Sequence, residues 1–231
     1  MDFNNNGYFR LYFTDNISVI INDTVLGTWL IGAVLIVFAI IARSKFKNFK
    51  DVPETKFQNF VEVLVEFFDN IVVGSMDRKY AHIGNWFFGV FLFFWIANIS
   101  GIFGMRAPTA DLATTFAMSI STVVLMTAVG IYYSKWAYFK DLMSPFPIFL
   151  PLNILGDVSK SISLGARLFG NIFGGTIVMG MLYSMLPWFV IVLGIPGTLS
   201  IYLDIFVGTL HAYVFVVLSM TFIRLKAPME E

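Results

Sequence analysis

The chain has 231 residues, of which 58% are hydrophobic and 13% charged, and its formal net charge at pH 7 is zero. A soluble domain carries about 25% charged residues, so much of the usual charged surface is missing, and the even charge balance gives no electrostatic basis for binding nucleic acid. The absence of cysteine excludes disulfides and thiolate metal sites, and two histidines are too few for a histidine-rich metal site. With a mean hydropathy of +0.78, the composition indicates an integral membrane protein, and we expect it to have no cofactor.

The N-terminal part of the chain is a polar segment followed by an apolar run. Residues 1–24 are rich in asparagine and lack the basic start, short apolar run and cleavage site of a secretory signal. Residues 25–42 are about long enough to cross a ~30 Å hydrocarbon core as a first span. The basic residues that follow are Arg43, Lys45, Lys47 and Lys50. Positive residues beside a span mark the cytoplasmic side, which predicts an external N-terminus.

Three further segments follow before the C-terminal part. In residues 55–76, apolar side chains recur at helical spacing and polar ones take the other faces, which predicts an amphipathic helix lying at the membrane interface. Residues 86–103 form a second apolar span and residues 112–133 a third. Asp111 stands directly before the third span, where a carboxylate caps a helix N-terminus well.

Residues 152–225 contain two longer apolar segments with Pro187 between them. Both segments exceed the ~20 residues of a simple span, so they must tilt steeply, bend or run partly along the membrane. Arg224 and Lys226 close the chain on the inner side. The sequence therefore predicts an all-α membrane protein, a single domain over residues 1–231. It has about five crossing helices, one interfacial helix and a tilted C-terminal helix hairpin, with an external N-terminus and a cytoplasmic C-terminus.

One charge lies in the middle of the first arm of this hairpin. Arg167 stands within the stretch SISLGARLFGNIFGG, where every other residue is apolar, small or uncharged. A guanidinium keeps its proton in proteins, and at bilayer depth a charge costs about 3 kcal/mol or more. One alternative is that the side chain snorkels to the headgroups. Its central position instead favours a role in an ion pathway or as a counter-ion.

Two polar stripes run along the hairpin at steps of three or four residues, which place their members on one side of a helix. The stripe on the first arm consists of Asp157, Lys160, Ser163, Arg167 and Asn171. The stripe on the second arm consists of Ser200, Asp204, Gly208 and His211. The small residues Gly165, Gly170, Gly174 and Gly175 also lie on the first arm. Glycines at such spacings, and Gly208, are typical of close helix packing.

The charged residues of the two stripes allow more than one interpretation. Asp204 and His211 lie one to two turns apart in an apolar helix, where a carboxylate and an imidazole can relay protons. Alternatively, Asp204 is a buried ion-pair partner of Arg167 or Lys160. Asp157 and Lys160, nearer the end of their helix, are expected to form a local ion pair or to contact headgroups.

The chain lacks the motifs of the common hydrolases. It contains no GxxxxGK[ST], HExxH or GxSxG sequence, so it has no visible means of hydrolysing ATP or a peptide. A membrane enzyme using Asp204 and His211 as an acid–base pair would have neither a nucleophile nor a metal motif. A stand-alone secondary ion transporter or channel is the main alternative to the interpretation below. Many transporters contain inverted repeats, whereas here the unusual features lie only in the C-terminal half.

Four segments together resemble one family. Residues 163–175, SLGARLFGNIFGG, are similar to the signature of subunit a of bacterial F-type ATP synthases. The segments PTAD at 108–111, FWIANISG at 94–101 and GTLHAYVF at 208–215 are similar to other parts of that subunit, in the same order. The resemblance therefore covers nearly the whole chain.

The resemblance implies a non-catalytic stator subunit in a bacterial plasma membrane. It implies two offset ion half-channels against a ring of c subunits, which couple ion flow to ring rotation and ATP synthesis, together with the b-subunit peripheral stalk and the other subunits. Arg167 would face the ring carboxylate, displace its bound ion and block a leak between the half-channels. The other residues that we expect along the ion path are Asn171, Thr176, Ser200, Asp204 and His211.

The chain departs from the family pattern at three of these positions. Thr176 stands where many members have glutamate, nine residues after the arginine, and Asp204 stands where others have histidine or glutamate. His211 occupies a position that is usually glutamine. We expect protons to be the coupling ion, but these departures leave sodium as an alternative.

Overall fold

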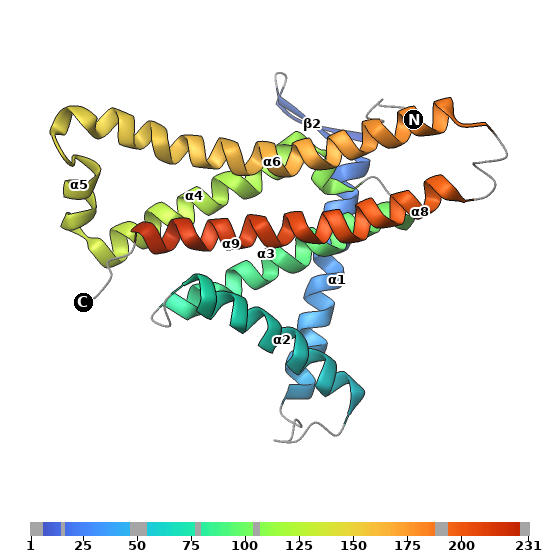
Figure 1. Ribbon diagram of the computed structural model, residues 1–231, viewed down its shortest axis with the longest axis horizontal. Coiled ribbons are helices and arrows are strands. Elements are labelled where there is room, and N and C mark those ends of the chain that lie inside the picture. The colour runs from blue at the N-terminus through green and yellow to red at the C-terminus, as the bar shows by residue number, and fades with distance from the viewer. Residues whose placement is uncertain are drawn as a thin grey trace.

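The computed structural model describes residues 7–14, 17–46, 55–76, 80–103, 107–187 and 194–226 (Figure 1). The α-helices are α1 (Asp23–Phe46), α2 (Lys56–Ser75), α3 (Ala81–Ile99), α4 (Leu112–Ser134), α5 (Trp136–Leu142), α6 (Leu150–Met185), α8 (Ile195–Ile201) and α9 (Gly208–Lys226). Between them lie the short 3₁₀ turns η2 (Ser100–Phe103), η3 (Pro108–Ala110) and η4 (Pro147–Phe149), and one π-helical segment, η5 (Tyr202–Val207). The two strands are β1 (Gly7–Thr14) and β2 (Ile17–Asn22).

The prediction of an all-α membrane protein with five crossing helices is confirmed. In the described part of the chain, five helices are long and apolar enough to cross a membrane: residues 23–46, 82–99, 112–134, 147–185 and 196–226. Helices suit this role because all their backbone groups can bond within the segment. The first helix runs four residues beyond the predicted end of its span, so that Arg43 and Lys45 form its last turn. Hydropathy marks only the apolar part of a helix, whereas the backbone continues into the polar flank.

The amphipathic segment forms α2. The hydroxyl of Thr55 caps this helix by accepting a hydrogen bond from the backbone N–H of Gln58 at 3.1 Å. Phe68 and Val72 are buried against α3 and α9, whereas Phe60 on another face is exposed. Apolar side chains therefore lie both on the face of α2 that packs against the protein and on its outer face, where they are suited to contact lipid. Its position at the membrane interface stays a prediction.

The N-terminal segment contains a structure that was not predicted. β1 and β2 pair antiparallel, with Gly7 opposite Asn22 and Thr14 opposite Ile17. The signal is present in the sequence, because aromatic and β-branched residues, which favour strands, dominate both GYFRLYFT and ISVIIN. The polar composition of residues 1–24 concealed it. The predicted external segment is therefore a β-hairpin in its described part.

The last helices form an antiparallel hairpin, as predicted. Figure 1 shows α6 running in one direction and α8 and α9 returning beside it, with α1 crossing their long axis steeply. The two arms contact each other sparsely. Instead, α6 packs mainly along α4, while α9 packs along α3 and also on α4. The largest fully buried side chains of this core include Tyr80, Phe87, Phe94, Met76, Met126, Leu168 and Met220.

The start of α4 is fixed by the predicted cap. The carboxylate of Asp111 accepts a hydrogen bond from the backbone N–H of Ala113 at 3.1 Å. Its other oxygen accepts one from the hydroxyl of Thr24 at 3.1 Å. Because Thr24 lies in the first turn of α1, this carboxylate also joins the starts of two helices that are far apart in sequence.

Candidate functional site

Arg167 lies near the middle of α6 and is exposed on the surface of the chain. Among the described residues it has no hydrogen-bond or ion-pair partner. The alternative in which Asp204 pairs with Arg167 or Lys160 is wrong for this structure. Lys160 instead pairs with Asp157 at 2.8 Å, and Asp204 accepts a hydrogen bond from the hydroxyl of Ser200 at 3.3 Å.

One polar contact joins the two arms of the hairpin near Arg167. The amide nitrogen of Asn171, one turn along α6 from Arg167, lies 3.1 Å from Nδ1 of His211 on α9. An amide nitrogen only donates, so a hydrogen bond here requires the tautomer of His211 in which Nδ1 accepts. The structure thus brings together three residues that the sequence predicted for the ion path.

Asp204 lies in a different place from this cluster. It belongs to the π-helical segment η5, between α8 and α9. Both of its carboxylate oxygens lie against Gly101 in η2, directly after α3, where an added Cβ would be 3.2 Å from Oδ2. Single π-helical turns inside α-helices are frequent at functional sites. No residue pattern in the sequence distinguishes such a turn from a regular helix.

A buried amide on α3 holds the first turn of α9. Asn98 donates a hydrogen bond from Nδ2 to the carbonyl of Gly208 at 2.9 Å, and its Oδ1 accepts one from the hydroxyl of Thr109 at 2.9 Å. Trp95 donates from Nε1 to the hydroxyl of Thr209 at 3.0 Å. The sequence alone predicted no role for the side chains of Trp95, Asn98 and Thr109. An asparagine inside an apolar helix was the available signal, because a buried amide needs partners.

The glycines of the two arms divide into two groups. A Cβ on Gly165 would lie 3.3 Å from Phe116 and Ser119 of α4, and one on Gly208 would lie 2.8 Å from Asn98 of α3. These two positions let helices approach closely. The other three predicted packing glycines have no atom within 4 Å of such a Cβ: Gly170, Gly174 and Gly175. No helix in the described part of the chain covers them.

Thr176 is the remaining predicted site residue. Its hydroxyl donates to the carbonyl of Ile172 at 2.9 Å, four residues earlier on the same helix. This local bond is the usual one for a threonine within a helix. The structure does not bring Thr176 into hydrogen-bond contact with Arg167 or Asp204.

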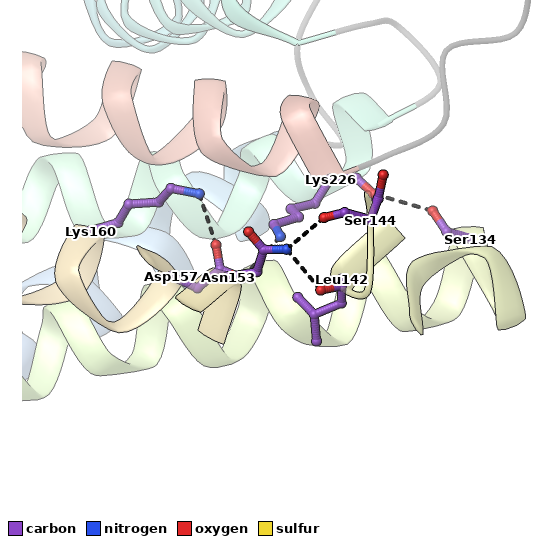
Figure 2. A network of polar contacts seen from close by, with 7 residues as sticks. All are labelled: Ser134, Leu142, Ser144, Asn153, Asp157, Lys160 and Lys226. Atoms are coloured by element: carbon purple, nitrogen blue, oxygen red, sulfur yellow. Dashed lines mark hydrogen bonds and ion pairs between the residues drawn. The ribbon is translucent and has the colours of Figure 1, made fainter. Parts of the chain in front are cut away.

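A second charged cluster lies at the end of the hairpin next to α5 (Figure 2). The predicted pair between Lys160 and Asp157 is present at 2.8 Å, and Lys226, the last residue of α9, reaches the other oxygen of Asp157 at 2.9 Å. From the sequence, Lys226 was predicted only to lie at the inner flank of the last helix. A contact between residues 69 positions apart requires the hairpin to be folded, so local spacing could not reveal it.

Comparison with known proteins gives one consistent family. The family model described as "ATP synthase A chain" matches residues 25–224. The chain is 34% identical to the sodium ion specific ATP synthase subunit a of Propionigenium modestum, over 87% of this chain and 72% of that protein. It is 31% identical to ATP synthase subunit a of Moorella thermoacetica, over 88% of this chain and 89% of the relative. The corresponding protein of Limosilactobacillus reuteri is 33% identical over 71% of this chain and 76% of its own length. With a match that spans three of its five crossing helices fully and nearly all of the other two, the chain belongs to the ATP synthase subunit a family.

Proposed function

We propose that this chain is the stator subunit through which ions cross the membrane sector of a rotary F-type ATP synthase. The observation that carries the proposal is Arg167, a permanent cation in the middle of an apolar helix that is exposed and has no ion-pair partner among the described residues. A charge at that depth needs an anion or water. Since the described chain supplies no carboxylate to Arg167, a carboxylate on a neighbouring subunit is the natural counter-charge.

The surface around Arg167 suits a closely packed neighbour. Gly170 and Gly174 are one turn apart on the same helix, and open space lies above both. Small residues at this spacing allow another helix to approach a transmembrane helix closely. In this proposal the neighbour is the c-subunit ring, whose carboxylate meets Arg167 once for each subunit that passes. The b subunit and the remaining subunits hold the chain still against the ring.

The arrangement of polar groups supports two separate access routes. The Asn171–His211 contact is one turn from Arg167, while Asp204 lies in η5 against Gly101, directly after α3. Ions entering by one route would reach the ring on one side of Arg167 and leave on the other side. The guanidinium between the routes repels cations and prevents a direct leak. In this proposal the N-terminus is external and the basic ends of α1 and α9 are cytoplasmic.

Asp204→Asn is expected to lower ion-driven ATP synthesis about 100-fold, the lower end of what a positioned acid–base group contributes. The amide keeps the shape of the side chain but neither takes up a proton nor neutralises a sodium ion. Synthesis is measured in membrane vesicles after an imposed ion gradient. The matched control is Asp23→Asn, the same substitution at an exposed position in the first turn of α1. A wild-type rate of ion-driven ATP synthesis with Asp204→Asn would show that Asp204 is not part of the ion path.

ATP-driven ion uptake into inverted vesicles tests the proposal itself and identifies the ion. For a proton-coupled subunit we expect ATP-driven acidification that a protonophore abolishes, with no sodium uptake. Sodium uptake that persists or rises with the protonophore would assign sodium instead, as the name of the Propionigenium modestum relative states for that protein. Vesicles containing Arg167→Ala serve as the control. Equal uptake with and without Arg167 would contradict the proposed function.

A further inference from the structure

At the end of the hairpin next to α5, one carboxylate forms ion pairs with two ammonium groups. Asp157 on α6 contacts Nζ of Lys160 at 2.8 Å and Nζ of Lys226 at 2.9 Å. The first contact joins residues three apart on one helix, whereas the second joins α6 to the last residue of α9. The side chains of Asp157 and Lys226 are only 12% and 13% exposed. Of the two pairs, the one between helices is therefore the better shielded from solvent.

Other contacts hold Lys226 in place. Its backbone carbonyl accepts a hydrogen bond from Ser134, the last residue of α4, at 3.2 Å. Its ammonium group lies 5.5 Å from the centre of the Tyr138 ring on α5. Asn153 of α6 donates to the carbonyl of Leu142, at the end of α5, at 2.8 Å. Figure 2 shows the hydrogen bonds of Ser134 and Asn153, which bring the ends of α4, α5, α6 and α9 close together.

The hairpin arms are also joined by the Asn171–His211 contact. This contact and the Asp157–Lys226 ion pair agree with one antiparallel register of α6 and α9. Along α6, Asn171 is 14 residues from Asp157, and along α9, His211 is 15 residues from Lys226. At a rise of 1.5 Å per residue, the two contacts are separated by about 21 Å on one arm and about 22 Å on the other. Lys160 lies 5.6 Å from the centre of the Phe222 ring, which agrees with the same antiparallel alignment.

Both arms are continuous helices between these two contacts. α6 runs without interruption from Leu150 to Met185, and α9 from Gly208 to Lys226. The π-helical segment η5 lies beyond His211 and so outside this interval. A helix without a proline, π turn or other defect transmits a shift at one end to the other. The position of His211 along α6 is therefore linked to the position of Lys226.

From this geometry we infer that the Asp157–Lys226 ion pair is a positioning device that sets the register of the hairpin. It places His211 beside Asn171 and one turn from Arg167, and it acts on ion translocation only through these residues. The expected effect of the ion pair on ion coupling rests on the proposed function, whereas its expected effect on the register of α6 and α9 does not. Although α9 also packs on α3 and α4, the two arms touch each other sparsely, and we expect loss of the pair to let α6 and α9 shift along each other.

Two variants that each remove one ammonium group from the same carboxylate provide a matched test. We expect Lys226→Gln to lower ion-driven ATP synthesis in vesicles at least ~10-fold, since small misplacements of reacting groups have large effects on rate. Lys160→Gln, which leaves the interhelical pair intact, should stay near wild type. The exchange Asp157→Lys with Lys226→Asp keeps the summed side-chain length and should restore most of the activity. Equal losses in both glutamine variants, or no recovery in the exchange variant at wild-type abundance in the membrane, would overturn the inference.

A measurement of register separates this inference from the proposed function. The chain contains no cysteine, so cysteines placed at Asn171 and His211 in the whole complex are the only thiols in this subunit. These substitutions remove the Asn171–His211 contact, so that the Asp157–Lys226 ion pair is the remaining hydrogen bond or ion pair between the described residues of α6 and α9. We expect a short bifunctional thiol reagent to join the two cysteines efficiently in the parent and with Lys160→Gln, but several-fold less with Lys226→Gln. Unchanged cross-linking with Lys226→Gln would overturn the positioning role, whatever the ion-transport experiments show.

Discussion

Replacing Arg167 with lysine is expected to lower ion-driven ATP synthesis about 1,000-fold, the upper range for the loss of one preorganised electrostatic contact. Lysine keeps a positive charge in water, but an ammonium group in a low-dielectric site releases its proton far more readily than a guanidinium does. It also lacks the planar pair of donors that binds a carboxylate at two points. The measurement is ATP formation in vesicles after an imposed ion gradient.

Assembly provides the control for this experiment. Arg167 is exposed and has no hydrogen bond or ion pair with the part of the chain that the structure describes, so its replacement should not disturb the fold. The amount of the subunit in the membrane, determined by immunoblotting, is expected to equal wild type. If Arg167→Lys supports wild-type ATP synthesis, the role that we assign to the guanidinium is wrong.

Gly208→Val is expected to destabilise the subunit by about 3 kcal/mol, combining overpacking with the loss of a buried hydrogen bond. A Cβ at this position would lie 2.8 Å from Cβ of Asn98, closer than real side chains approach. Relief requires α9 to move away from α3, which breaks the bond from the Asn98 amide to the carbonyl of Gly208. The measurement is the abundance of the subunit in the membrane and the temperature at which the complex dissociates.

The matched control is the same substitution at Gly32 in α1. Both glycines are helical, so the change in helix propensity is the same, but no atom lies within 4 Å of a Cβ at Gly32. We expect Gly32→Val to leave abundance and dissociation temperature unchanged. Equal destabilisation by the two substitutions would show that the contact between α9 and Asn98 is not what limits residue size at position 208.

The number of crossing helices and the order of the elements could be predicted from the sequence because hydropathy is a local property. Each apolar run long enough to span the bilayer must satisfy its own backbone, and a helix does so within the segment. The cap at Asp111 was predictable for the same reason, since a carboxylate and the N–H groups that it caps are neighbours in sequence. The signal for the N-terminal β-hairpin was also local, because aromatic and β-branched residues dominate both strands, but it lay within a segment of polar composition.

The candidate site was predictable as a set of residues but not as a set of contacts. Arg167 and Asp204 were identifiable because charges are costly in apolar helices, wherever their partners lie. Whether they pair with each other depends on the rotation and register of two helices, and the structure separates them. The π-helical turn at Asp204 and the open surface over Gly170 are likewise results of packing, because no short sequence pattern encodes them.

The sequence by itself determined that this chain crosses the membrane as helices and carries a permanent cation within one of them, since composition, periodicity and the chemistry of arginine decide these properties residue by residue. Only the tertiary structure decided that His211 meets Asn171, that Asp204 faces Gly101, and that Lys226 closes the hairpin on Asp157. These contacts join residues 40 to 103 positions apart. Such contacts depend on how long helices pack and slide against each other, which is a property of the whole bundle.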